Sequence, residues 1–334
     1  MVSSSLAGRA LTPTVELESF AIGDVVDERY ELLDVIATGA VGVVYRAQQR
    51  ATQRVVALKL LHPWLGEDAG LVERTAREAR FAGSIRHPNI IEIVDAGRTE
   101  SGQPFIAMEH LVGWTLREHL RRNGRLTLVA AAGIMTPIVA AIAAAHGVGI
   151  VHRDIKPANV VLVEGEHGPI PKVVDFGLAG VIATANERER LTATGTVMGT
   201  FEYMAPEQAI GAMPKPAFDV YALGVVLHEL LTGVRPFTGE SEAELMQAKL
   251  VGLLDERPML YARVPEPWRN LVSRCVAHDP LARPTAMQLL RELELLAGDG
   301  PRVEAPTPKR AGLRGVVFAL GFAIGGLVAF VTSG

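Results

Sequence analysis

The sequence predicts an α+β fold with two unequal lobes, followed by one membrane-spanning helix. Between residues 30 and 111, short β-type runs are separated by turn-forming breaks. From residue 112 to about 297, apolar residues recur mainly at helical spacing. Residues 315–331 contain no polar side chain. These observations predict a small antiparallel β lobe with one helix, a larger helical lobe and a C-terminal transmembrane helix.

Composition limits the class of protein. The chain has 334 residues, 49% of them hydrophobic, which is enough for about two compact units with a sizeable core. A net charge of -4 disfavours a nucleic-acid-binding protein, which is usually basic. The one cysteine, Cys275, excludes an intrachain disulfide, favours a reducing compartment and is expected to be a small buried hydrophobe. No histidine has a cysteine partner at zinc-site spacing.

The small lobe is expected to follow a flexible leader, residues 1–27, which lacks an apolar stretch of signal-peptide length. The β-type runs begin at Tyr30, and Gly39 and Gly42 indicate tight turns between antiparallel strands. A helix is predicted at about 68–85. Five strands are expected, at residues 30–37, 41–48, 54–61, 90–97 and 104–111.

Helices are expected to dominate after residue 114. The segment 125–146 is apolar on nearly every side, which predicts the central buried helix of the larger lobe. The segment 219–233 is similar and ends at a glycine, a common helix stop. Ser241 and Thr285 are favourable N-cap residues for two further helices.

Polar residues gather around residues 152–177. Asp154, Lys156 and Asn159 lie close together, and Asp175 follows a hydrophobic run. Carboxylate and amide oxygens suit Mg²⁺, which usually also takes phosphate oxygens and water. A lysine can neutralise a moving phosphoryl group, and Asp154 would remain to accept a hydroxyl proton. A set of ordinary capped turns is the alternative interpretation.

The motifs resemble those of protein kinases. HRDIKPANV at 152–160 is similar to the kinase catalytic loop, and DFG at 175–177 to the metal-binding motif. Other kinase motifs appear in the family's order, namely VALK at 56–59, Glu78, APE at 205–207, Asp219 and Arg283. The resemblance covers about residues 28–297 and implies a bilobal kinase domain with lobes at 28–111 and 112–297. It points to bacterial Hanks-type (eukaryotic-like) serine/threonine kinases with a C-terminal transmembrane anchor.

The resemblance assigns roles to these residues. Asp154 is expected to be the catalytic base, and Lys156 to contact the γ-phosphate. Asn159 and Asp175 are expected to hold Mg²⁺, with Mn²⁺ as a possible substitute. Lys59 is expected to pair with Glu78 and to steady the α- and β-phosphates. The resemblance also implies structural roles, namely an ion pair between Glu207 and Arg283, anchoring of the catalytic loop by Asp219, and a scaffold role for His152.

ATP is expected to bind between the lobes. The glycine-rich loop departs from the family pattern, because Ala37 stands in place of the first glycine. Weaker ATP binding, without loss of activity, is the most that this change is expected to cause. Adenine is expected under Val44 and Ala57, beside a hinge at 108–111 with Met108 as gatekeeper, although a plain edge strand is an alternative. The residues expected to contact the nucleotide are Ile36, Thr38, Gly39, Ala40, Val41, Gly42, Val44, Ala57, Lys59, Glu78, Glu109 and Leu111.

The resemblance also suggests substrate class and control. Lys156 and Thr200 resemble the serine/threonine group, so protein serine and threonine hydroxyls are the expected acceptors. Thr192 or Thr194 is expected to be autophosphorylated, and Arg153 is of the type that pairs with such a phosphate. A polar surface loop is the alternative for these threonines.

The C-terminal segment is expected to anchor the protein. Residues 298–314 form a linker with Lys309, Arg310 and Arg314, and residues 315–332 form the predicted single-pass helix. The basic residues place the kinase domain in the cytoplasm by the positive-inside rule. GxxxG spacing at 321–325 suggests a possible homodimer, although glycines are also simply tolerated in such helices. A buried C-terminal helix is the alternative to a membrane span.

Two other functions compete with a protein kinase. A pseudokinase scaffold is disfavoured by intact Lys59, Glu78, Asp154, Asn159 and Asp175. A small-molecule phosphotransferase is disfavoured by the APE motif with Arg283 downstream. A P-loop NTPase is excluded because the sequence contains no G-x-x-x-x-G-K-[ST] motif.

Overall fold

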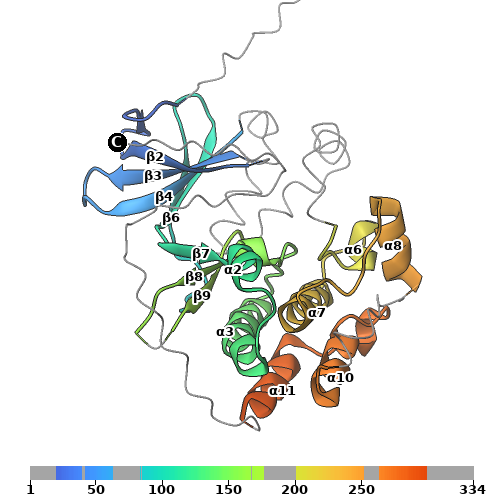
Figure 1. The fold of residues 1–334 in the computed structure, drawn as a ribbon. Coiled ribbons are helices and arrows are strands. Elements are labelled where there is room, and N and C mark those ends of the chain that lie inside the picture. Colours follow the sequence, from blue (N-terminus) through green and yellow to red (C-terminus); the bar gives the residue numbers. More distant parts are fainter. Residues whose placement is uncertain are drawn as a thin grey trace, which may run out of the picture.

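A computed structural model describes residues 20–39, 42–62, 83, 85–166, 168–176, 201–251 and 263–298. It shows an upper lobe built from strands and a lower lobe in which helices predominate (Figure 1). This is the predicted α+β arrangement of two unequal lobes. The helix predicted at about 68–85 falls almost wholly outside the described residues, and the predicted membrane segment at 315–332 falls entirely outside them.

The small lobe contains a six-stranded antiparallel sheet in the order β1-β2-β3-β4-β6-β5. At the start of β2 buried and exposed residues alternate, whereas β4 and β6 are buried along almost their whole length, as expected for strands with both faces covered. Tyr30, Leu32, Leu58 and Phe105 form the centre of that core. The strands are β1 (Val25–Val26), β2 (Tyr30–Thr38), β3 (Gly42–Gln49), β4 (Val55–Leu61), β5 (Ile93–Arg98) and β6 (Pro104–Glu109).

The sixth strand corrects the sequence prediction of five. β1 lies within the residues expected to be a flexible leader, and Val25 pairs with Glu31 while Val26 pairs with Tyr30. Val26 is fully buried. A two-residue strand is too short to show an alternating pattern, so only its pairing with β2 and the burial of Val26 reveal it.

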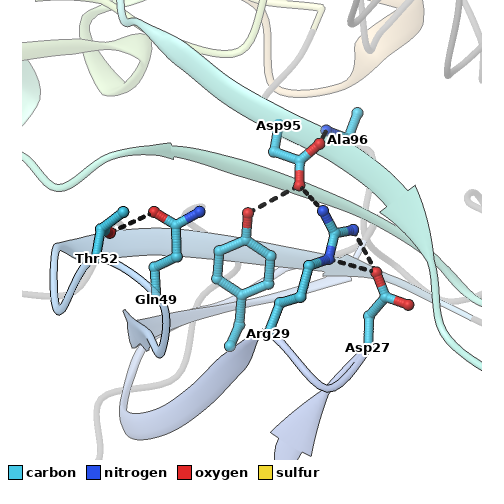
Figure 2. A network of polar contacts seen from close by, with 7 residues as sticks. Asp27, Arg29, Gln49, Thr52, Asp95 and Ala96 are labelled. Carbon is cyan, nitrogen blue, oxygen red and sulfur yellow. Dashed lines mark hydrogen bonds and ion pairs between the residues drawn. The ribbon is translucent and has the colours of Figure 1, made fainter.

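A polar network joins the two ends of this curled sheet (Figure 2). Arg29, in the turn before β2, forms ion pairs with Asp27 and with Asp95 on β5. The Tyr30 hydroxyl donates to the same Asp95 carboxylate at 2.8 Å, and burial together with this carboxylate raises the pKa of Tyr30. β2 and β5 are far apart in the strand order, so these contacts require the sheet to curl.

The large lobe begins with a three-stranded antiparallel sheet that sequence analysis did not predict. Its strands are β7 (Gly113–Thr115), β8 (Val160–Val163) and β9 (Ile170–Val173), in that order. Gly113 permits close strand approach, because a Cβ there would lie 2.2 Å from the Leu162 carbonyl oxygen. Three or four residues carry too little periodicity to identify a strand.

The described helices of the large lobe surround one apolar core. The α-helices are α2 (Leu116–Asn123), α3 (Leu128–Gly147), α6 (Pro206–Ala209), α7 (Pro216–Thr232), α8 (Glu242–Val251), α10 (Glu266–Cys275) and α11 (Ala286–Gly298). Short 3-10 turns occur at η2 (Pro157–Asn159) and η3 (Pro280–Ala282). The predicted caps are present, since Ser241 Oγ accepts from Glu244 N and Thr285 Oγ1 from Gln288 N.

The helix α3 is the predicted central helix of this lobe. Its buried residues belong to the main hydrophobic core, and it packs against α7 and α11. Within the described part of the chain, it is the helix whose length and composition would suffice to cross a membrane. More than half of its most apolar stretch is buried inside the protein, so its apolar character reflects its place in the core.

Candidate active site

The segment between α3 and β8 brings three predicted site residues together. Lys156 Nζ lies 2.8 Å from Asp154 Oδ2. Asn159 Nδ2 donates to the same oxygen at 2.9 Å and to the Asp154 carbonyl at 2.8 Å. Because the amide nitrogen of Asn159 is directed at Asp154, its side-chain oxygen is the atom left to bind a cation.

Asp219 at the start of α7 holds the backbone of this loop. Its carboxylate accepts hydrogen bonds from the backbone N–H groups of His152 and Arg153, both at 2.8 Å. His146 Nε2 lies 2.8 Å from the same carboxylate. Arg153 has a φ of 69°, a conformation that L-residues rarely adopt without support from their surroundings. The predicted anchoring by Asp219 is therefore present.

The His152 side chain links the loop to the strand that precedes Asp175. The imidazole is fully buried, and its Nε2 donates to the Val174 carbonyl at 3.0 Å. Its Nδ1 accepts from the Asp154 N–H at 3.3 Å. The ring also lies 4.5 Å from the Phe176 ring, measured between centroids. Both ring nitrogens are used in backbone contacts, which agrees with the scaffold role expected for His152.

Lys59 and Asp175 come from different lobes and meet in the interior. Lys59 Nζ lies 2.8 Å from Asp175 Oδ1, and the side chains are only 3% and 12% exposed. Asp175 has a φ of 61°, the second unusual backbone conformation in this region. Val174, just before Asp175, donates its N–H to the Asn159 carbonyl at 2.9 Å. The lysine pair and the catalytic loop are therefore directly connected.

The expected Lys59–Glu78 pair falls on a residue outside the described part of the chain. The same holds for Ala40 and Val41 of the glycine-rich loop, for Gly177 of the DFG motif, and for the three threonines Thr192, Thr194 and Thr200. These expectations stay predictions.

A pocket of about 410 Å³, including space open to solvent, lies beside this region. Four of its lining residues, Ile36, Ala57, Glu109 and Leu111, were predicted to contact the nucleotide. The pocket residues missed from the sequence are Ile91, His110, Gly113, Thr115, Glu118 and Val161.

The pocket is bounded by an apolar cluster that joins the two lobes. Val44 and Ala57 of the small lobe pack in one buried cluster with Val161 and Val174 of the large lobe. Met108, the expected gatekeeper, belongs to the same cluster. Apolar side chains on this side of the pocket suit contact with an aromatic ring system. Val161 lies in the apolar run VVLV, but nothing in that run distinguishes a pocket wall from ordinary core.

The hinge side of the pocket has defined hydrogen-bonding groups. The Glu109 N–H donates to the Glu92 carbonyl at 2.9 Å. The backbone carbonyl of Glu109 is therefore the group left to accept a hydrogen bond from a nucleotide base. The Glu109 carboxylate pairs with Lys172 on β9 at 2.7 Å. Burial lowers the pKa of His110, and the charge of Arg46 lowers it further, so both favour the neutral form of this lining residue.

The glycine-rich loop has a structural requirement that the sequence did not reveal. The backbones of Gly39 and Gly42 bond each other, with N–O distances of 2.9 and 3.4 Å. A Cβ on Gly42 would lie 2.0 Å from the Leu60 carbonyl oxygen, so the packing of β3 on β4 already excludes a side chain. Thr38, the last residue of β2, is exposed, whereas Ala37 beside it is buried in the apolar cluster that joins the lobes.

The donor set fits a magnesium nucleotide. Asn159 and Asp175 supply an amide oxygen and a carboxylate, the hard ligands that Mg²⁺ prefers. Across the described ranges, no group of three or more His, Cys, Asp or Glu side chains is arranged to hold a metal ion. A divalent ion bound by Asn159 and Asp175 would therefore need further oxygens, which ATP phosphates and water provide.

A buried ion pair stabilises the end of the segment that follows the undescribed residues 177–200. Arg283 donates to both Glu207 oxygens, at 2.6 and 2.9 Å, and the arginine side chain is fully buried. This is the predicted Glu207–Arg283 pair. The neighbouring Gln208 donates to the Arg153 carbonyl at 2.7 Å, a contact that the sequence did not predict.

Comparison with known proteins places these features in a wider context. Residues 30–293 match the family described as protein kinase domain. Serine/threonine-protein kinase Pkn3 of Myxococcus xanthus is 33% identical over 305 residues, covering 89% of this chain and 55% of the relative. Serine/threonine-protein kinase PrkC of Bacillus subtilis is 40% identical over 262 residues, covering 78% of this chain and 39% of the relative. The chain thus spans about half or less of these relatives' length.

A solved structure shows the same fold. Rad53 1-466 in complex with AMP-PNP has a TM-score of 0.66 and 26% identity, with coverage of 79% of this chain and 64% of that chain.

Proposed function

The chain belongs to the protein kinase family, and from this premise we propose that it transfers the γ-phosphoryl group of ATP to serine and threonine hydroxyls of proteins. One observation carries the proposal. Two polar clusters lie side by side next to a pocket with apolar walls, namely Lys59–Asp175 and Asp154–Lys156–Asn159. A backbone hydrogen bond between Asn159 and Val174 joins them. Pairing offsets much of the cost of burying these charges, but it is an inefficient way to stabilise a fold, which favours a role in binding a charged ligand.

The proposed chemistry assigns one task to each group. The acceptor hydroxyl oxygen bonds to the γ-phosphorus while the bond from that phosphorus to the β,γ-bridging oxygen breaks and ADP leaves. Asp154 accepts the hydroxyl proton, and Lys156 offsets negative charge on the moving phosphoryl group. Asn159 and Asp175 would hold Mg²⁺, which neutralises phosphate charge, and Lys59 would steady the α- and β-phosphates.

The decisive experiment uses radiolabelled ATP, Mg²⁺ and a generic basic protein as acceptor. Asp154→Asn keeps the size of the side chain but removes the base, so labelling should fall by at least about a hundredfold. Asp34→Asn is the matched control, because its carboxylate is half exposed and pairs only at the surface with Arg46. Equal labelling by wild type and Asp154→Asn would discard the proposal, and absence of labelling by wild type would favour a scaffold.

We also propose that residues 315–332 anchor this kinase in the cell membrane with its catalytic domain in the cytoplasm. Support comes from the 17 apolar residues 315–331 and the basic residues before them. The full chain should fractionate with membranes, and a chain ending at residue 314 should not. Membrane association of the shorter chain would contradict this proposal.

Activation by autophosphorylation is the third part of the proposal. Thr192 and Thr194 are the candidate acceptors. Arg153, the residue before Asp154, would pair with the phosphate on one of these threonines. Dimerisation through the GxxxG spacing at 321–325 would bring two domains together for phosphorylation in trans. Mass spectrometry of active protein should find phosphate between residues 184 and 200, and unmodified active protein would refute it.

A further inference from the structure

Lys249 is a buried lysine to which the proposed phosphoryl transfer assigns no role. It lies on α8 and is 1% exposed. Its Nζ donates to three backbone carbonyls, those of Phe201 at 2.6 Å, Glu202 at 3.0 Å and Met204 at 2.8 Å. One side chain therefore gathers three carbonyls of a single short segment, residues 201–204, which leads into α6.

The geometry requires the charged form of this lysine. An ammonium group has three N–H donors and no acceptor, which matches three carbonyl acceptors. A neutral amine has only two N–H donors, and its lone pair would face the third carbonyl oxygen. The Tyr221 ring, whose centroid is 5.5 Å from Nζ, gives a further favourable contact for a cation. An ordinary solvated lysine would have none of these contacts.

Two other contacts fix the same segment from different elements. The Tyr203 hydroxyl donates to the Glu229 carboxylate of α7 at 2.6 Å; Tyr203 is buried and Glu229 is half-buried. Glu202 pairs with Arg235, which lies after the end of α7. With Lys249, these contacts tie residues 201–204 to α7, to the residues that follow it, and to α8.

This segment is connected to the proposed catalytic base. Gln208 of α6 is four residues beyond Met204 and donates to the carbonyl of Arg153, the residue directly before Asp154. A bound substrate would place its acceptor hydroxyl at Asp154. Because an extended peptide advances about 3.3 Å per residue, the substrate residues on either side of that hydroxyl would reach the elements around the catalytic loop. A displacement of segment 201–204 would change the surface that these flanking residues meet.

We infer that Lys249 is a positioning residue that shapes the acceptor-binding surface by holding the carbonyls of residues 201–204. The inference rests on the proposed protein kinase function and adds a residue to it. The contacts of Lys249 are with residues 201–204 and Tyr221, none of which is assigned to ATP or to the phosphoryl transfer, so it should govern how well the acceptor binds, not how ATP binds.

The electrostatics of this site make the contact sensitive to pH. Burial, the largest effect, and the charge of Arg235 both lower the pKa of Lys249, while Glu202 partly offsets them, and the net pKa is about 7. As the pH rises through about 7, the ammonium loses a proton and one carbonyl loses its donor. The KM for the acceptor should therefore increase on the alkaline side, while an arginine at this position stays charged throughout.

The test compares wild type, Lys249→Met and Lys249→Arg with a serine-containing peptide as acceptor. The peptide KM of Lys249→Met should rise on the order of tenfold, the scale of a lost hydrogen bond to a charged group, while the KM for ATP stays within about twofold. Lys215→Met is the matched control, because Lys215 is an exposed lysine of the same lobe. Lys249→Arg should retain more of the peptide affinity than Lys249→Met.

The possible outcomes separate the two proposals. If wild type phosphorylates the peptide but Lys249→Met has an unchanged peptide KM, the inference fails and the kinase function stands. If wild type phosphorylates no acceptor, the proposed function fails and the inference with it. If Lys249→Met does not fold, the pH series decides. A peptide KM that rises above pH 7 in wild type but not in Lys249→Arg supports the inference, and a flat profile in wild type overturns it.

Discussion

Lys59 and Asp175, which are 116 residues apart in the sequence, form a 2.8 Å ion pair between the two lobes. The pair is almost inaccessible to solvent, so removing the Lys59 ammonium would leave the Asp175 carboxylate poorly compensated. Burying two charges in this way is not an efficient means of stabilisation, which favours a ligand-binding role.

The first prediction concerns this pair. Lys59→Met should reduce kcat/KM for peptide phosphorylation by at least about a hundredfold, because it removes a positive charge aimed at the nucleotide phosphates. It should also abolish the thermal stabilisation that Mg²⁺-ATP gives to wild type, since a ligand stabilises only the state that binds it. Lys215→Met serves as the control in calorimetry and kinetics. A Lys59→Met protein with wild-type ATP stabilisation would contradict the phosphate-binding role.

The second prediction concerns Ala37, which stands where the family pattern has a glycine. Its methyl group is buried in the apolar cluster that joins the lobes, and its backbone pairs with Val44. Ala37→Gly should lower the free energy of unfolding by about 1 kcal/mol through backbone entropy. Activity should change by no more than a few fold. A hundredfold gain in kcat/KM for ATP would show that the alanine is a real defect.

The third prediction contrasts a buried arginine with an exposed one. Arg283→Met leaves the Glu207 carboxylate without its partner in a protein interior and should cost about 3–5 kcal/mol of stability. Arg29→Met breaks ion pairs near the surface (Figure 2) and should cost less than about 1 kcal/mol. Urea denaturation of both variants gives the comparison. Equal losses would mean that burial does not set the strength of these pairs.

The fourth prediction uses the chain's one cysteine. Cys275 is fully buried against α7, and burial raises the pKa of its thiol to about 12. Below pH 9 the native thiol should resist alkylation, because the thiolate is the reactive form, whereas the denatured protein should react at once. The raised pKa also means that this thiol's contribution to stability is complete below about pH 9. Between about 9 and 12, the unfolded thiol ionises and that contribution is lost.

The measurement is the rate of thiol labelling with and without denaturant. Labelling of the native protein at pH 8 as fast as that of the unfolded protein would contradict the burial of Cys275.

The candidate site was largely recognisable from the sequence because its polar residues lie in short motifs. Asp154, Lys156 and Asn159 are within six residues of one another, so their mutual contacts depend mostly on one loop. The roles of Gly42 and Lys249 could not be predicted. Gly42 is required by the Leu60 carbonyl of a neighbouring strand, and Lys249 meets carbonyls more than forty residues earlier in the chain.

The sequence by itself determined the order of the lobes, the apolar central helix α3 and the helix caps at Ser241 and Thr285. Each of these depends on residues close together in the chain, where side-chain period and local hydrogen bonds leave a visible pattern. Only the tertiary structure decided the short strand β1, the β7–β9 sheet and the contacts that tie residues 201–204 to α7 and α8. These arise when distant segments bury one another, and no local pattern records which segments will meet.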